Sequence, residues 1–189
     1  MSGAVAGDDG RLRCPWALSA PEYVAYHDDE WGRPVADDRA MFERLTLEAF
    51  QSGLSWLVIL RKREGFRAAF DNFEPAKVAA YDDSDVARLL ADAGVVRNRA
   101  KIEAAIANAQ AALDLDGGLL AQVQRFAPQT HLDAPRTLAE VRAQSEESKA
   151  LAKDLRKRGF RFVGPTTMYA LMQATGIVDD HLADCWRRT

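Results

Sequence analysis

Apolar residues recur along most of the chain at helical spacing, and nowhere do apolar and polar residues alternate long enough to predict a sheet strand. The pattern therefore predicts an all-α fold. Turn and capping residues predict a short helix that has Pro21 in its first turn and carries Tyr23, Tyr26 and His27. They predict further helices over about 37–53, 56–64, 83–93, 99–115, 146–158 and 165–175. Residues 126–145 contain Pro128, Pro135 and scattered polar residues, and they are expected to form a loop with at most a turn or two of helix.

Length and composition predict one globular unit. Of 189 residues, 48% are hydrophobic and 28% are charged, which is typical of a folded domain with a single core. Residues 1–10 are small and polar and predict a disordered tail, which leaves residues 11–189 as a single domain. The apolar run 54–60 is too short to cross a membrane, and no signal segment opens the chain, so a cytoplasmic protein is expected. No long exposed heptad pattern is present, and a monomer is expected.

The charge balance excludes a surface that is basic all over, because 25 basic residues face 28 acidic ones, but it allows a local basic patch. The densest basic run, 149–161, leads into the turn Gly159 to Gly164, and Pro165-Thr166-Thr167 then opens another helix. Backbone N–H groups at a helix start, next to basic side chains, can hold a phosphate without reading base sequence. The alternative is an ordinary helical hairpin whose charges form its solvated face.

The cysteines and histidines suggest a metal site. Cys14 and His27 lie near one end of the chain, and His181 and Cys185 lie near the other. The short spacing of the second pair would place both on one face of a helical turn. Two thiolates and two imidazoles are the donor set of a structural zinc ion, with no position left for a catalytic water. The alternative is a pair of buried core thiols and two histidines with ordinary hydrogen bonds.

A carboxylate lies in a part of the sequence that is rich in aromatic residues. Glu48 is expected on a helix that ends near Gly53, and Ser55 is expected to cap the next helix, which begins at Trp56. The first third of the chain also contains the aromatic residues Trp16, Tyr23, Tyr26 and Trp31. Aromatic faces can sandwich a purine, and a carboxylate can accept a hydrogen bond from its exocyclic amine. The alternative is that the rings belong to the core and that Glu48 is a surface residue.

Five motifs together identify a family. They are CPW at 14–16, YVAYHDDEWG at 23–32, LEAFQSGLSW at 47–56, GFRFVGPT at 159–166 and DHLADC at 180–185. The motifs occur in the order that is typical of the 3-methyladenine DNA glycosylase I family, bacterial enzymes of alkylation repair. The chain resembles this family over about residues 11–185.

The resemblance implies a fold, a cofactor and a set of site residues. It implies the all-helical fold of the helix-hairpin-helix glycosylase superfamily, with one structural zinc ion on Cys14, His27, His181 and Cys185 that clamps the two terminal segments together. It implies a base pocket of Glu48, Tyr26 and Trp56, with Trp16, Tyr23 and Trp31 as further walls. The expected DNA contacts are Gly159, Arg161, Gly164, Thr166 and Thr167 of the hairpin, and Gly53 and Leu54 where the vacated duplex must be filled.

The activity that the resemblance implies is hydrolytic excision of 3-methyladenine from alkylated double-stranded DNA, after the nucleotide is flipped out. Glu48 would mainly recognise the cationic base. Many superfamily members place an Asp after the hairpin to support the sugar cation, so Asp179 and Asp180 are candidates for that role. No lysine is placed to form a Schiff base, and an enzyme without lyase activity is expected.

Three residues that depart from the family pattern and two competing functions complete the prediction. Ala49 and Phe50 replace the Gly and Gln of the family, so Phe50 is a candidate to change the packing of the pocket, and Pro15 replaces a small residue. One competitor is a catalytically silent module that binds damaged DNA. The other is a zinc hydrolase, which would need an open metal position and a general base such as Glu30.

Overall fold

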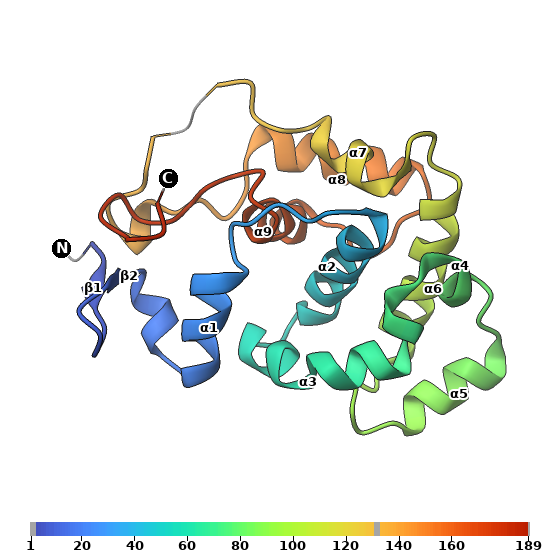
Figure 1. Cartoon of the computed structure of the whole chain (residues 1–189). Helices are drawn as coiled ribbons and strands as arrows, with labels where there is room; N and C mark the ends of the chain where they lie inside the picture. The colour runs from blue at the N-terminus through green and yellow to red at the C-terminus, as the bar shows by residue number, and fades with distance from the viewer. Residues whose placement is uncertain (1–2, 131–132, 189) are drawn as a thin grey trace.

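The computed structural model describes residues 3–130 and 133–188, which are mostly helical (Figure 1). The α-helices of this part are α1 (Pro21–Asp29), α2 (Asp38–Gln51), α3 (Trp56–Ala69), α4 (Pro75–Ala79), α5 (Asp83–Ala91), α6 (Arg99–Leu113), α7 (Gly118–Gln124), α8 (Glu146–Lys157) and α9 (Pro165–Ala174). Short 3-10 helices are η1 (Pro15–Leu18), η2 (Asp71–Phe73) and η3 (Leu138–Glu140). No helix in the described ranges is long and apolar enough to cross a membrane.

Helix α2 is the centre of the packing. It contacts α3, α6, α7 and α9, and Figure 1 shows it enclosed by them. Met41, Phe42, Leu45, Leu47 and Phe50 are fully buried on its different faces. A helix that is buried on nearly all sides belongs to the interior of a domain. Glu48, one of the acidic residues of α2, is therefore held in a largely apolar interior.

Capping side chains begin several helices where the sequence predicts them. The side chains of Asp37, Asp82, Asn98 and Ser145 each accept a hydrogen bond from a first-turn N–H group of α2, α5, α6 and α8, respectively. Ser55 precedes α3 in an extended conformation but makes no such bond, so its predicted capping role is wrong. Its extended backbone still directs the chain from the turn after α2 into α3.

Helix α3 is longer than predicted, and its interior glycine explains why. The sequence suggests an end near residue 64, but α3 continues to Ala69 and buries Phe66. A Cβ atom at Gly65 would lie 2.5 Å from the carbonyl oxygen of Gly94. Gly65 thus permits close approach of another segment and does not end the helix. The short helices α4 and α7 are also absent from the sequence prediction.

The first residues are more ordered than the predicted tail. Strand β1 (Val5–Ala6) pairs antiparallel with strand β2 (Leu12–Arg13), with Val5 opposite Arg13. The prediction of disorder is wrong for residues 3–10, because Asp9 in the connecting turn binds the Arg13 guanidinium at 2.7 Å. Met1 and Ser2 lie outside the described residues. The all-α prediction is likewise corrected by this small two-stranded sheet.

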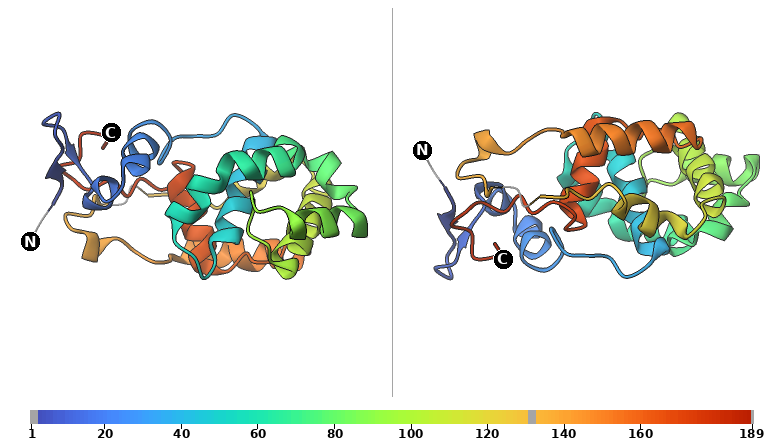
Figure 2. Two further views of the ribbon diagram at one scale, coloured as in Figure 1. Left: turned by 90° about the horizontal axis from the view of Figure 1, so that it is seen from below. Right: turned by 90° about the horizontal axis from the view of Figure 1, so that it is seen from above.

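The two ends of the described chain lie side by side. Figure 2 shows both at the same end of the molecule. The N–H group of Trp186 donates to the carbonyl oxygen of Leu12 at 2.8 Å, and the N–H group of Ala4 donates to Asp184 Oδ1 at 2.8 Å. The segment 126–145 contains only η3 in its described part, as predicted. His131 and Leu132, within this segment, lie outside the described residues.

Candidate functional site

A cavity of about 270 Å³ lies where α1, α2, α3 and α9 meet η1. Its lining residues are mostly aromatic: Trp16, Tyr23, Tyr26, Trp31, Glu48, Gln51, Trp56, Ala170 and Gln173. The structure thus brings together all of the residues that the sequence predicts for the base pocket. The predicted residues come from the first third of the chain, and Ala170 and Gln173 join them from α9.

The aromatic rings of the cavity form a connected cluster. The ring centroids of Tyr26 and Trp56 are 5.4 Å apart, with the two planes tilted by 45°. Trp16 contacts the edge of Tyr23 at 5.7 Å and of Trp31 at 5.1 Å. Such contacts hold each ring in one orientation. The cavity therefore has rigid, apolar walls suited to a flat heterocycle.

Glu48 is a desolvated carboxyl group at this cavity. Its exposed fraction is 5%, and no residue in the described part of the chain donates a hydrogen bond to its side chain. Burial raises the pKa of Glu48 to about 8, against the weaker opposing effect of the Arg44 charge. Burial, and then the nearby Glu48 charge, also raise the pKa of Tyr26. A cation in the cavity would stabilise the ionised form of Glu48.

A second hollow of about 350 Å³ adjoins this cavity and shares Glu48, Gln51 and Ala170 with it. The turn between α2 and α3, with Ser52, Gly53 and Leu54, borders this hollow. Thr166 and Thr167, at the start of α9, also line it. Four of the predicted DNA contacts therefore border one opening of the cavity. Leu54 is 40% exposed there.

The other predicted DNA contacts lie elsewhere on the hairpin. Arg161 lines a separate hollow with acidic residues that include Asp82, Asp83 and Glu103. Gly159 and Gly164 flank the turn between α8 and α9, and neither lines a described hollow with Thr166 and Thr167. The structure does not bring Arg161 to the edge of the aromatic cavity.

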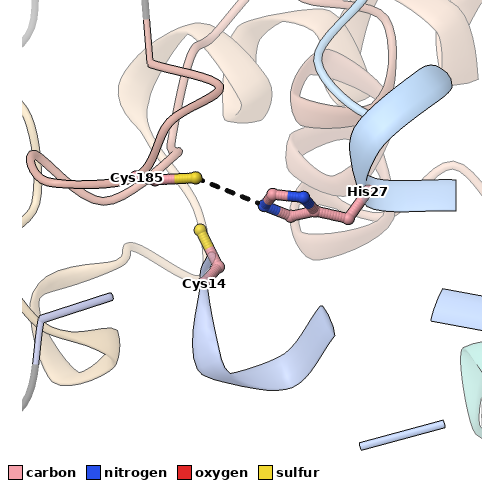
Figure 3. A group of neighbouring side chains, drawn as sticks. All are labelled: Cys14, His27 and Cys185. Atoms are coloured by element: carbon pink, nitrogen blue, oxygen red, sulfur yellow. Dashed lines mark hydrogen bonds between the residues drawn. The ribbon is translucent and has the colours of Figure 1, made fainter. Parts of the chain in front are cut away.

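Three of the predicted metal ligands converge at the joined ends of the chain. The donor atoms of Cys14, His27 and Cys185 lie within 4.8 Å of one another, and all three residues are buried (Figure 3). The Cys185 Sγ atom lies 3.5 Å from His27 Nε2. The His181 ring lies 5.0 Å from the His27 ring, and its Nε2 atom is buried without a hydrogen-bond partner. An unpaired buried nitrogen beside this cluster suits a fourth ligand.

Both histidines are held through the other ring nitrogen. His27 Nδ1 lies 2.8 Å from Asp28 Oδ1, and His181 Nδ1 lies 2.8 Å from Asp179 Oδ1. With the ring proton on Nδ1, each carboxylate accepts a hydrogen bond from that N–H group and Nε2 is left as the basic nitrogen, which is how metal-binding histidines are commonly oriented. Arg13 in turn donates to Asp28 at 2.7 Å.

The two thiols are close enough to influence each other's ionisation. Contact with the Cys14 thiol lowers the pKa of Cys185, and the same contact raises the pKa of Cys14. Binding a metal would displace the thiol protons, because sulfur atoms bind metals as thiolates. The donor set therefore fits zinc.

The cysteine and histidine cluster and the aromatic cavity share a wall. The Trp31 ring lies 4.6 Å from the His181 ring, and the Trp16 ring lies 5.2 Å from the His27 ring. Trp16 and Trp31 also line the cavity. A change in the position of the cluster histidines would therefore shift Trp16 and Trp31, which form two walls of the cavity.

A comparison with known families decides what this arrangement is. The methyladenine glycosylase family model matches residues 16–188. The chain belongs to this family. Among curated relatives, the DNA-3-methyladenine glycosylase 1 of Escherichia coli is 46% identical over 92% of this chain and 95% of its own length. A DNA-3-methyladenine glycosylase of Haemophilus influenzae is 43% identical, with 92% and 96% covered.

Solved structures of the family superpose closely. A crystal structure of a 3-methyladenine DNA glycosylase I has a TM-score of 0.89 at 43% identity and covers 94% of this chain and 100% of its own. A Staphylococcus aureus structure, described as showing the basis of 3-methyladenine recognition, has a TM-score of 0.87 at 35% identity and covers 92% and 95%. The fold of this methyladenine glycosylase family member is therefore shown over nearly all of its length.

Some sequence expectations are corrected by the structure. His181 and Cys185 do not share a helical turn, because residues 181–185 form turns and bends in which the Cys185 N–H group donates to the Leu182 carbonyl oxygen. Phe50 does not line the cavity. It is fully buried and packs against the edges of Phe66 at 4.8 Å and Phe70 at 5.9 Å, so its ring fills the core.

The two candidate aspartates have other partners. Asp180 accepts hydrogen bonds from the Tyr169 hydroxyl at 2.8 Å and from Gln173 Nε2 at 2.7 Å. Asp179 binds His181 and also Arg188, whose Nε lies 3.4 Å from Asp179 Oδ2. Neither aspartate lines the aromatic cavity. Their contacts are those of supports for neighbouring side chains.

Sequence reasoning missed three residues that line the cavity, Gln51, Ala170 and Gln173. Gln51 lies three residues after Glu48 on α2, so helical spacing could have placed it on the same face. Ala170 and Gln173 have the same spacing on α9. Their position beside α2 depends on packing between segments that are distant in the sequence, and no local sequence pattern predicts such packing.

Proposed function

We propose that this protein is a monofunctional DNA glycosylase that excises 3-methyladenine from alkylated double-stranded DNA. The observation that carries the proposal is Glu48, a buried carboxyl group without a partner in the described part of the chain, set among aromatic rings. A neutral ligand would leave the burial of an ionised Glu48 uncompensated, whereas a cationic planar ligand satisfies both the acid and the rings.

The chemistry of the methylated base matches this site. Methylation at N3 gives the adenine a positive charge, so the bond to the sugar is already weak and the base leaves as a neutral molecule. Water then adds to the sugar carbon and releases a proton. The site therefore needs to flip out, recognise and hold the base more than to activate it. No lysine lies among the described residues of the cavity, which supports hydrolysis without a Schiff base.

The surroundings of the cavity support DNA as the partner. We assign the α8–α9 segment as the helix-hairpin-helix element, with Gly159, Arg161, Gly164, Thr166 and Thr167 holding the DNA backbone. Gly53 and Leu54 fill the gap that the flipped base leaves, because exposed Leu54 borders the hollow that adjoins the cavity. Thr166 and Thr167 border the same hollow. One bound duplex could therefore contact these threonines through its backbone while Leu54 fills the gap left by the flipped base.

The cofactor in this proposal is one structural zinc ion, held by Cys14, His27, His181 and Cys185. The converging donors, the unpaired Nε2 atom of His181 and the carboxylates at both Nδ1 atoms support this set. The ion supplies cross-linking and no reaction step, since four protein ligands leave no position for water. We further propose that the protein acts as a monomer in the cytoplasm.

Release of free base from methylated DNA tests the function. Wild-type protein is expected to release 3-methyladenine, and not 7-methylguanine, as separated by chromatography. Glu48→Ala is expected to reduce the release, because the cationic base loses its counter-charge. Glu43→Gln alters a carboxylate on the same helix that pairs with Arg67 outside the cavity, and this control should keep its activity. A well-folded wild type that releases no base would indicate a silent DNA-binding module.

A further inference from the structure

One face of α6 carries two buried polar side chains. Lys101 and Asn108 are seven residues apart, which is two turns, so they lie on the same side of the helix. Lys101 is 8% exposed and Asn108 is 0% exposed. A lysine is rarely buried to this extent without partners, and neither residue lines the aromatic cavity. Their partners show what they do.

Lys101 binds the end of α2. Its Nζ atom donates to the carbonyl oxygens of Phe50 at 2.8 Å and Ser52 at 2.5 Å. The last carbonyls of a helix have no partners within the helix, and a cation is favoured there by the helix dipole. Gly53 and Leu54 follow Ser52 directly. Lys101 thus fixes the base of the turn that borders the hollow beside the cavity.

Asn108 binds the turn between α8 and α9. Its Nδ2 atom donates to the carbonyl oxygen of Arg161 at 3.0 Å, and its Oδ1 atom accepts from the N–H group of Arg161 at 2.7 Å. The next residue, Phe162, has φ of 55° and is 37% exposed. A bulky residue keeps such a backbone conformation only when its surroundings hold it there. Asn108 supplies part of that constraint.

We propose that Lys101 and Asn108 are positioning residues that set the separation of the two DNA-contacting turns. Both turns are anchored to the same rigid helix by paired, directional hydrogen bonds, whereas apolar contacts alone would allow them to slide. The α2–α3 turn and the start of α9 border the same hollow, so their separation determines how a duplex enters it. The inference rests on the proposed function, because it concerns how DNA reaches that cavity.

Two binding measurements separate positioning from recognition. Fluorescence anisotropy reports the affinity for a duplex that contains a tetrahydrofuran abasic analogue, and tryptophan quenching reports the affinity for free 3-methyladenine. Lys101→Met and Asn108→Leu are each expected to weaken duplex binding about tenfold and to change base binding less than about twofold. Lys101→Arg, which keeps a cation with several donors, should restore duplex binding to within about threefold of wild type.

Matched controls remove similar bonds at other places. Lys62 donates to the Ala93 carbonyl oxygen, and Gln110 on α6 donates to the Ala79 carbonyl oxygen. Lys62→Met and Gln110→Leu should leave duplex binding unchanged. Asn108→Ser, whose side chain is too short to bind both Arg161 groups, replaces Asn108→Leu if circular dichroism shows that the latter is unfolded.

The outcomes distinguish this inference from the proposed function. Unchanged duplex binding in both variants, or an equal fall in duplex and base binding, overturns the positioning role while the wild type remains a glycosylase. A wild type that neither binds the abasic duplex nor releases base overturns the proposed function and this inference with it. Loss of duplex binding alone, restored by Lys101→Arg, supports the inference.

Discussion

The raised pKa of Glu48 predicts how activity depends on pH. Burial raises this pKa to about 8, so the free protein holds Glu48 protonated below that pH. A cationic base needs the carboxylate form. The second-order rate of 3-methyladenine release should therefore rise with pH until about 8 and then level off, since this rate reports the free enzyme.

Glu48→Gln is the control for that profile. It keeps the shape of the side chain but cannot ionise, so its rate should be lower and should lack the rise. A duplex that carries preformed 3-methyladenine should be assayed under single-turnover conditions across the range. A wild-type rate that falls between about pH 6 and about pH 8 would contradict the assignment of Glu48 as the counter-charge.

The same pKa predicts an effect on stability with a defined sign. Glu48 has an ordinary pKa of 4.5 when unfolded and about 8 when folded, so between these values the folded protein binds more protons. The contribution of Glu48 to the free energy of unfolding is complete below about pH 4.5 and is lost as the pH rises through about 8. Denaturant unfolding at several pH values should show a smaller decline in Glu48→Gln. Equal declines in both proteins would argue that Glu48 is solvated.

At the scale of elements, the turn between α8 and α9 contains two glycines with different backbone requirements. Gly159 has φ of 95°, whereas Gly164 has φ of −69°, and a Cβ atom at either would meet no other atom within 4 Å. Gly159→Ala should lower the free energy of unfolding by about 1–2 kcal/mol, because a side chain is strained at positive φ. Gly164→Ala should leave it nearly unchanged.

Urea unfolding measures both glycine variants, and duplex binding adds a second distinction. Gly164 precedes the first turn of α9, where the proposed backbone contacts lie, so its added methyl group should weaken binding of abasic duplex without loss of stability. Equal stability of the two variants would mean that the turn adjusts its backbone freely and that Gly159 is not required there.

A carboxylate links α1 to α2 and α3. Glu30 accepts from Arg44 of α2 at 2.9 Å and from two nitrogens of Arg63 of α3. Because Glu30 is paired with two arginines, it is not the free general base that a zinc hydrolase would need. Glu30→Ala should lower the free energy of unfolding by about 1–3 kcal/mol, since it leaves two half-buried arginines unpaired.

Exposed ion pairs provide the comparison for Glu30. Glu146 pairs with Lys149 on the surface of α8, and Glu146→Ala should change stability by less than about 0.5 kcal/mol. Urea denaturation of the two variants against wild type measures the difference. A loss at Glu30 no larger than the loss at Glu146 would show that the arginines find water or other partners.

The sequence predicts elements well where the signal is local. Caps at Asp82 and prolines at Pro21 and Pro165 begin helices where they are expected, since these effects act within one turn. Prediction fails where distant segments decide. The predicted end near residue 64 is too early, because α3 continues to Ala69 and Gly65 lets it approach Gly94 closely. The ordered start of the chain depends on the pairing of Asp9 with Arg13.

The candidate site shows the same division. Motif resemblance names Glu48 and the rings around it, which the structure brings to one cavity. The resemblance does not predict that Gln173 of α9 lines the cavity or that Gln173 donates a hydrogen bond to Asp180. Both contacts depend on how the folded segments pack against one another. Lys101 is likewise an unremarkable helix residue in the sequence, and only its two carbonyl partners reveal its burial.

At the scale of the whole molecule, the ends of the chain and the cavity form one structural unit. The cluster of Cys14, His27 and Cys185 joins segments that are separated by most of the chain. Trp16 and Trp31 contact the histidines on one side and line the cavity on the other. Tying the ends together therefore also holds two walls of the cavity.

Metal removal should consequently affect the ends first and the cavity next. Protein purified without added zinc is expected to contain about one equivalent of metal, as measured by elemental analysis. Cys185→Ser and His181→Ala should each lose metal and show a lower melting temperature. His131→Ala should keep both, because His131 is the histidine outside the proposed ligand set.

A strong chelator should have the same effect as these substitutions. Once the thiolates lose the metal, the sheet of β1 and β2 and the segment after Asp180 lose their shared anchor. Limited proteolysis should then cut near both ends while the helices around α2 stay protected, and tryptophan fluorescence should change because Trp16 and Trp31 adjoin the cluster. Equal metal content in wild type and Cys185→Ser would contradict the ligand set. Metal loss in His131→Ala would do the same, because His131 is not one of the four proposed ligands.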